Sequence, residues 1–365
     1  MQHLALKPRE IIKLTHLIVL AGGLSLIVIC IYLATTQYSS TASYPPGKPH
    51  AQHIQTSPSG TPFDLDVLIR EVTGNTPEES FELLRRLITD KPEVVPRCHN
   101  IAHELGHIFY RKYGDFTKAA KAQDDLCGSG YIHGVIEEKF GDIAERAIPD
   151  VVKTLCEPVQ DSRCYHGVGH GLMFATKFDY KKSLRYCDLY PKDSDARVNC
   201  SDGVFMQYYG EGTLSYTTRI SIGSPQKLET FCDEQAESYQ FSCIYYAPRN
   251  FISHNPGKYS QLMTYCQELK NPIFRTTCLT GAGSMVMKLN LNQPQLAEAA
   301  CVSTENDQQH CIAGMLHYYN LHYGRDERSL ELCHKLTTAK DICIKSMEMS
   351  QLRQVSATRS FTHEP

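Results

Sequence analysis

Histidines gather in the first half of this chain at spacings that suit metal binding. Three stretches carry them, and they read CHNIAHELGH from residue 98, CGSGYIHGVIE from residue 127 and CYHGVGHG from residue 164. Side chains four residues apart lie on one face of a helix, so each stretch groups its polar side chains if it is helical. The candidate metal ligands on these faces are His99, His103, His107, His133, Glu137, His166 and His170.

The residue types indicate which metals such a group would bind. Imidazole nitrogen is a good ligand for zinc, copper, iron and nickel, and three or four ligands from adjacent helices form sites in helical-bundle metalloproteins. We therefore expect a divalent transition metal, zinc or copper. Met206 follows its cysteine by six residues, as His133 and His170 follow theirs. A thioether ligand from Met206 would favour copper.

The first stretch also contains the five-residue motif HExxH. It resembles the zincins, in which two histidines bind zinc and the glutamate is the general base, so it implies metal ligands at His103 and His107 and a catalytic Glu104. The longer metzincin motif is absent, because Tyr110 and Tyr113 stand where it requires Gly and His. Zincin sites usually accompany a sheet, which this sequence does not predict. A zinc peptidase is therefore an alternative, with a third ligand from one of the other two stretches.

A purely structural role is the alternative for each of these side chains. A single histidine on an apolar helix face is usually a hydrogen-bonded core residue. We assign that role to four histidines that lie late in the chain, outside the three stretches, namely His310, His317, His322 and His334. Six histidines at matched places are harder to explain by packing alone, and this favours the metal.

The elements that position these side chains are marked by cysteines. The chain has fifteen, of which Cys30 stands apart near the N-terminus. The others alternate between the end of one helix-like run and the start of the next. Adjacency in the sequence therefore predicts the disulfides 98–127, 156–164, 187–200, 232–243, 266–278, 301–311 and 333–343. A thiolate metal cluster is the alternative, but no close CxxC pair supports it.

The flanking sequence repeats with the cysteines, with a period of roughly 32–45 residues that is typical of helical hairpins. Glycine often stands three positions after the second cysteine, as in CGSG, CYHG, CSDG, CLTG and CIAG. Thr76, Pro77 and Glu79 form the start signal of a helix. These features predict an all-α fold, an α-solenoid of disulfide-linked helical hairpins over residues 60–350, with a polar tail at 351–365. Over residues 76–345 the repeats resemble tetratricopeptide-type and cysteine-rich helical repeat proteins.

The N-terminal region predicts a membrane anchor. Lys7, Arg9 and Lys13 precede an uncharged, mostly apolar stretch at 14–34 that is long enough to cross a bilayer as a helix. The positive-inside rule places the basic tail, 1–13, in the cytoplasm and the rest outside. An oxidising compartment outside the cell also suits the disulfides. Residues 35–59 are rich in Ser, Thr, Pro and Gly and read as a flexible stalk. A cleaved signal peptide is the alternative to this single-pass signal-anchor.

Composition limits the partners. The net charge of −3 gives no reason to expect nucleic acid, and the N-terminal helix implies the cell membrane. The function expected is a membrane-anchored, extracytoplasmic metal-binding protein, with a metal-dependent enzyme as one alternative. The other is a non-catalytic scaffold that binds protein, peptide or glycan on the solenoid surface. Paired tyrosines that could line such a groove are Tyr208, Tyr209, Tyr245, Tyr246, Tyr318 and Tyr319.

Overall fold

The computed structural model describes residues 65–122, 124, 126–159, 161–192, 194–210, 223–323 and 327–347. Within these ranges the chain forms helices and no strand, which confirms the all-α prediction. Four predicted segments lie outside the described residues, namely the cytoplasmic tail 1–13, the membrane anchor 14–34, the stalk 35–59 and the polar tail 351–365. Among the described helices, none combines the length and the apolar character needed to span a bilayer.

The repeats are helical hairpins that pair a short helix with a longer one. In chain order these pairs are α7 (Ile148–Thr154) with α8 (Ser162–Ala175), α9 (Tyr180–Cys187) with α10 (Asp195–Tyr208), α11 (Pro225–Asp233) with α12 (Glu237–His254), α13 (Tyr259–Gln267) with α14 (Pro272–Leu289), and α15 (Pro294–Val302) with α16 (Gln308–Tyr323). The last short helix, α17 (Glu327–Lys335), precedes helical residues 340–347. The predicted hairpin repeat is therefore present.

The array begins with a different arrangement. Helices α2 (Leu65–Val72) and α3 (Pro77–Asp90) form a hairpin that packs against α4 (Cys98–Tyr113). The short α5 (Phe116–Lys121) then connects α4 to α6 (Leu126–Gly141). The predicted start signal of α3 is confirmed, because the Thr76 hydroxyl accepts a hydrogen bond from the backbone nitrogen of Glu79 at 3.2 Å.

All seven predicted disulfides are present: 98–127, 156–164, 187–200, 232–243, 266–278, 301–311 and 333–343. Every bonded cysteine is buried, at most 1 % exposed. Six of the bridges close loops of 8–13 residues, and each of these stabilises the fold by about 2–3 kcal/mol by restricting the unfolded chain. The hairpins are therefore held together covalently as well as by packing.

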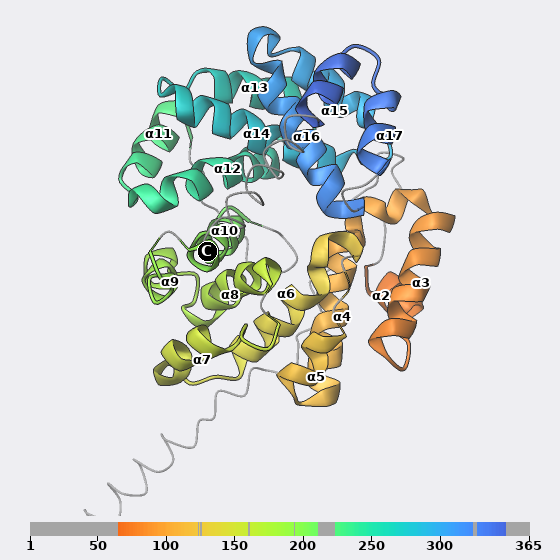
Figure 1. Ribbon diagram of the computed structural model, residues 1–365, viewed down its shortest axis with the longest axis vertical. Coiled ribbons are helices and arrows are strands. Elements are labelled where there is room, and N and C mark those ends of the chain that lie inside the picture. The colour runs from red at the N-terminus through yellow and green to blue at the C-terminus, as the bar shows by residue number, and fades with distance from the viewer. Residues whose placement is uncertain are drawn as a thin grey trace, which may run out of the picture. The chain divides into compact units, whose positions relative to one another are not determined.

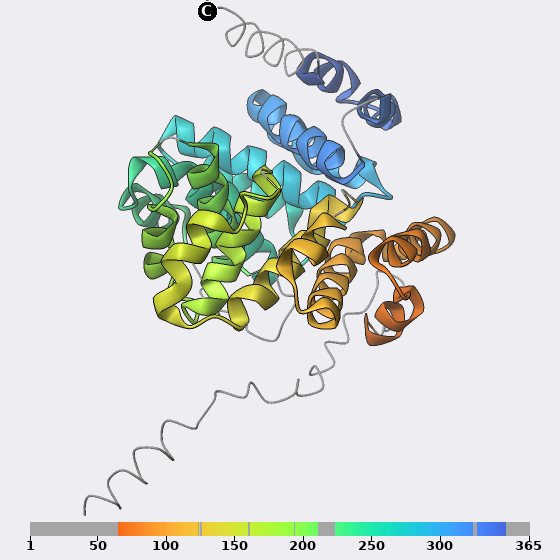
Figure 2. The ribbon, with the colours of Figure 1, turned by 60° about the horizontal axis from the view of Figure 1, so that its bottom comes forward.

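The long helices pack against one another in chain order, from α4 to α6, α8, α10, α12, α14 and α16. This succession can be followed in Figure 1 and from a second direction in Figure 2. The last of them, α16, also packs against α6. The solenoid prediction included contacts between neighbouring hairpins but not this return contact, which arises because small rotations between repeats accumulate along the array.

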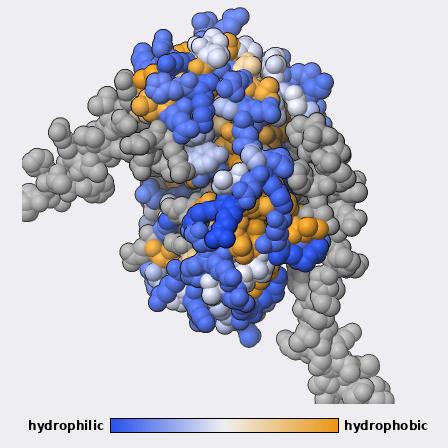
Figure 3. Space-filling model, turned by 90° about the vertical axis from the view of Figure 1, so that its right-hand side faces the viewer, coloured by the Kyte–Doolittle hydropathy of each residue, from blue (hydrophilic) through white to orange (hydrophobic). Residues whose placement is uncertain are grey.

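Buried apolar side chains form one continuous core that runs from Leu68 to Cys343. Hydrophilic residues cover most of the face drawn in Figure 3, where hydrophobic residues form separate patches between them. Burial of the apolar side of each helix against its neighbours is the main force that holds such an array together.

Glycines bring the long helices into backbone contact. A Cβ atom at Gly134 of α6 would lie 2.0 Å from the carbonyl oxygen of His103, and one at Gly106 of α4 would lie 2.1 Å from that of Tyr131. The same contact recurs between α8 and α10, where a Cβ atom at Gly203 would lie 2.0 Å from the carbonyl oxygen of His166. These close contacts set the distance between the helices that carry the histidines.

Candidate metal centre

The structure brings together all seven side chains that the sequence singles out as ligands. They come from α4, α6 and α8, which pack side by side. Their ligand atoms form three overlapping triads, and within each triad these atoms lie within 4.8 Å of one another. The triads are His99–His103–His133, His133–His166–His170 and His103–His107–Glu137.

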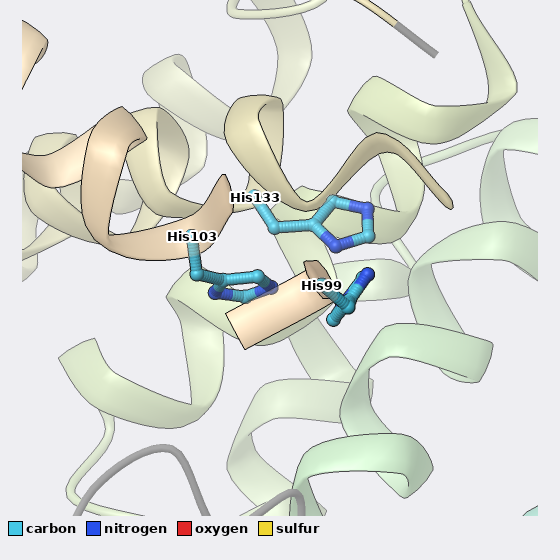
Figure 4. A group of neighbouring side chains, drawn as sticks. All are labelled: His99, His103 and His133. Carbon is cyan, nitrogen blue, oxygen red and sulfur yellow. The ribbon is translucent and has the colours of Figure 1, made fainter. Parts of the chain in front are cut away.

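The first triad lies at the contact between α4 and α6. Figure 4 shows the rings of His99 and His103, which come from one helix, next to the ring of His133 from the other. His103 and His133 are 2 % and 4 % exposed, and the Nε2 atom of His103 and the Nδ1 atom of His133 have no hydrogen-bond partner among the described residues. A buried polar atom without a partner costs about 1–3 kcal/mol, and a bound cation would remove that cost.

A carboxylate lies in the middle of the cluster. The Oε2 atom of Glu137 is 3.1 Å from Nε2 of His107 and 3.5 Å from Nδ1 of His103, and its Oε1 atom is 3.6 Å from Nδ1 of His170. The sequence named Glu137 as a candidate ligand, and the structure brings its two oxygens next to three of the histidines. Burial alone would raise the pKa of Glu137, but the charges and hydrogen bonds of His103 and His107 hold it well below its ordinary value.

His107 is held between two carboxylates. Its Nδ1 atom lies 2.8 Å from Oε2 of Glu138, which also pairs with Arg111 at 2.9 Å. Burial lowers the pKa of His107, but the hydrogen bonds with Glu137 and Glu138 outweigh it and raise the pKa to about 10. Without a metal, these two carboxylates favour the protonated form of His107. Glu138 was not among the predicted site residues, because neighbouring residues on a helix point in different directions.

Burial is the main cause that lowers the pKa of His133 well below its ordinary value, and the four neighbouring imidazoles lower it further. His133 is thus neutral near pH 7. A neutral imidazole is the form that binds metals.

The backbone helps to orient His99. Its Nδ1 atom lies 2.7 Å from the carbonyl oxygen of Cys127, which can only accept, so Nδ1 carries the proton and Nε2 carries the lone pair. Cys127 and Ser129 adopt left-handed backbone conformations, with φ of 60° and 61°. This conformation is costly for residues other than glycine and is found at functional sites that the surrounding structure holds in place. Here the disulfide of Cys127 to Cys98 anchors the segment beside His99.

The triad His133–His166–His170 meets α10. His170 donates from Nδ1 to Oε1 of Gln207 at 2.9 Å, which leaves the lone pair on Nε2. That Nε2 atom is 3.2 Å from Nε2 of His166, which is in turn 3.1 Å from the Sδ atom of Met206. The sequence had suggested Met206 as a soft ligand, and the structure places it beside the triad. Gln207 was missed, because glutamine carries no metal-binding signal.

Glu104 is half-buried and contributes no atom to the three triads. The carboxylate between the two histidines of the HExxH motif belongs instead to Glu137. Successive residues of a helix point about 100° apart, so Glu104 does not share the face of His103 and His107. A catalytic role for Glu104 stays a prediction.

No protein-family model, curated protein or solved structure matches the chain significantly. The function is therefore argued from the chemistry of the cluster.

The four late histidines, His310, His317, His322 and His334, belong to none of the triads formed by the described residues. His322 is buried and packs against the rings of Tyr318 and Tyr323. The structural role assigned to it from the sequence agrees with these contacts.

Asp202, outside the cluster, carries a carboxyl group with a buried oxygen. Asp202 of α10 is partly exposed as a residue, but its Oδ1 atom is buried and has no hydrogen-bond partner among the residues that the structure describes. Burial raises the pKa of Asp202 to about 7, and a hydrogen bond with Ser242 opposes this shift. A carboxyl group whose pKa rises on folding contributes stability that is complete below its unfolded value, 3.8, and is lost as the pH rises through about 7.

We therefore expect Asp202→Asn to stabilise the protein at pH 8 by about 1–2 kcal/mol and to leave its stability at pH 4 nearly unchanged. Chemical denaturation at a series of pH values measures this difference. Asp233→Asn removes an exposed carboxylate and serves as the matched control. An equal effect of Asp202→Asn at pH 4 and pH 8 would contradict the prediction.

Proposed function

We propose that this protein is a membrane-anchored, extracytoplasmic protein that binds transition-metal ions in the histidine cluster of α4, α6 and α8. The observation that carries the proposal is the set of three overlapping triads of ligand atoms, each within 4.8 Å. These atoms come from helices far enough apart in the sequence that only the fold brings them together. Zinc and copper are the metals that imidazole and carboxylate ligands suit best.

The spacing of the ligand atoms supports metal binding. Two ligands of a four-coordinate zinc ion with bonds of about 2.1 Å lie roughly 3.4 Å apart. The pairs His107–Glu137, His166–His170 and His103–Glu137 are separated by 3.1, 3.2 and 3.5 Å. Small side-chain shifts would therefore be enough to seat an ion.

Three alternatives explain the structure less well, namely a structural histidine cluster, a binding scaffold and a zinc peptidase. A structural histidine cluster leaves the Nε2 atom of His103 and the Nδ1 atom of His133 buried without hydrogen bonds from described residues. A scaffold that binds glycan or peptide through paired tyrosines would need those rings at the surface. Four of the six tyrosines are buried in the core instead, namely Tyr208, Tyr209, Tyr318 and Tyr319. A zinc peptidase would need Glu104 beside the metal, and Glu137 lies between the two histidines of that motif.

Metal analysis tests the proposal directly. The full chain, purified in detergent without chelators after growth with zinc and copper, is expected to contain at least one transition-metal ion per molecule by elemental analysis. EDTA at low pH should remove the metal, because protonated imidazole does not bind it, and metal added back at pH 7.5 should restore it. Absence of bound metal both before and after reloading would refute the proposal.

The membrane anchor and the location of the helical domain are part of the same proposal. They are supported by the basic residues Lys7, Arg9 and Lys13 before the apolar stretch 14–34. The seven disulfides add support, since such bonds persist in oxidising compartments.

Protease added to intact cells is expected to release a disulfide-bonded helical fragment by cutting within the stalk at 35–59. Non-reducing electrophoresis and the mass of the fragment measure this. A cytoplasmic marker protein that stays uncut controls for cell integrity. Release only after lysis would contradict the assigned orientation.

A further inference from the structure

We infer that the cluster is a two-ion centre with unlike sites, a harder one at His103, His107 and Glu137 and a softer, copper-binding one at His133, His166, His170 and Met206. The inference rests on the proposed metal binding and specifies how many ions bind and which kind each site takes.

Two of the triads have no residue in common. His103–His107–Glu137 and His133–His166–His170 each bring together the ligand atoms needed for one ion. The remaining triad, His99–His103–His133, shares one histidine with each of these two and adds only His99. A single ion takes four to six ligands within about 2.1–2.3 Å, so it cannot engage both ends of the cluster. The arrangement therefore provides two sites, with His99 between them.

The softer site is defined by three atoms that converge. Nε2 of His166 lies 3.2 Å from Nε2 of His170 and 3.1 Å from Sδ of Met206. Because His170 donates its Nδ1 proton to Gln207, its Nε2 atom carries a lone pair. A proton on Nε2 of His166 can form a hydrogen bond with either His170 or Met206, but not with both at full strength. A soft cation placed among the three atoms would interact with all of them. Thioether sulfur selects copper(I) over zinc, magnesium or calcium.

The harder site is built around Glu137. Its Oε2 atom faces His107 and His103, and carboxylate with imidazole is a typical ligand set for zinc. His107 is oriented from behind by Glu138, an arrangement that fixes the ring of a metal ligand. The other oxygen of Glu137, Oε1, turns toward His170, a ligand of the softer site. Glu137 therefore lies between the two ions and links them.

The experiment loads the detergent-solubilised full chain with copper(I) under anaerobic conditions and with zinc, separately and together. Elemental analysis is expected to give one copper and one zinc per chain when both are supplied. X-ray absorption at the copper edge should detect a sulfur neighbour near 2.3 Å in addition to imidazole nitrogens. This spectrum identifies the copper ligands in the unmodified protein, so the result does not depend on how any variant folds.

Two variants separate the sites. Met206→Leu should weaken copper(I) binding by about tenfold or more and leave zinc binding unchanged, since it removes one soft ligand at nearly constant volume. Glu137→Gln should weaken zinc binding and leave copper(I) binding unchanged. Met287→Leu, which replaces another buried methionine on α14, is the matched control for the first variant.

The outcomes distinguish this inference from the proposed function. A protein that binds one ion only, however metals are supplied, refutes the two-ion centre and leaves metal binding intact. Copper without a sulfur neighbour, or copper affinity unchanged in Met206→Leu, refutes the softer site. A protein that binds no metal refutes the proposed function itself.

Discussion

Replacing His103 and His133 together with alanine is expected to abolish transition-metal binding. Each of these two residues belongs to two of the three triads, so the double substitution removes at least one candidate ligand from every triad. Loss of a primary ligand costs more than the 10–100-fold typical of supporting residues, and here every triad loses one, so weakly held ions are expected to dissociate during gel filtration. Elemental analysis after gel filtration should then return metal at background level.

The variant is expected to stay folded, because the seven disulfides and the apolar core do not involve these imidazoles. In EDTA its unfolding free energy should lie within about 2 kcal/mol of that of the unmodified protein. The substitutions remove packing contacts of the two rings, but they also remove the cost of burying ring nitrogens that lack hydrogen bonds. The matched control is His310→Ala with His334→Ala, two histidines outside the triads. Full metal retention in the double variant at 103 and 133 would remove the basis of the proposed function.

Gly134→Ala is expected to be the most destabilising single methyl addition at the contact of α4 with α6. The added Cβ atom would lie 2.0 Å from the carbonyl oxygen and 2.8 Å from the carbonyl carbon of His103. These are backbone atoms of a packed helix, so no flexible side chain can move aside and the two helices must separate. We expect a loss of about 3–5 kcal/mol and a marked loss of metal affinity, because the ligands of both helices move apart.

Denaturant unfolding measures the first effect and metal titration the second. Gly141→Ala, at the last residue of the same helix, is the matched control, because a Cβ atom there meets nothing within 4 Å. Stability is expected to be unchanged or slightly raised in that variant, since alanine favours helix more than glycine does. A Gly134→Ala protein within about 1 kcal/mol of the unmodified one would show that the helices do not pack as closely as described.

The histidine cluster and the disulfides have separate roles in this fold. Small metal-dependent domains often unfold when the metal is removed, because the ion supplies the folding energy. Here disulfides tie the hairpins from α7 onward covalently and join α4 to α6, and the bonded cysteines are buried in the core. The histidine cluster is therefore held in place by the fold itself, and a bound metal would add to a fold that already exists.

The sequence by itself determined the helical class, the hairpin repeat and the disulfide pairing. Each of these depends on residues close together in the chain, such as the short loop from Cys187 to Cys200. Helical periodicity likewise determined that His99, His103 and His107 share one face. Local interactions and loop closure act over a few residues, so their outcome can be derived without knowing the rest of the fold.

Only the tertiary structure decided how these faces meet. It placed Glu137 in the middle of the imidazoles, added Glu138 and Gln207 as supporting partners, and divided the ligands into triads. It also returned α16 to α6. The reason is geometric: periodicity gives the direction of a side chain around its own helix, but the separation and rotation of neighbouring helices depend on where glycines let backbones touch. A shift of one ångström between helices changes which atoms fall within bonding distance of one ion.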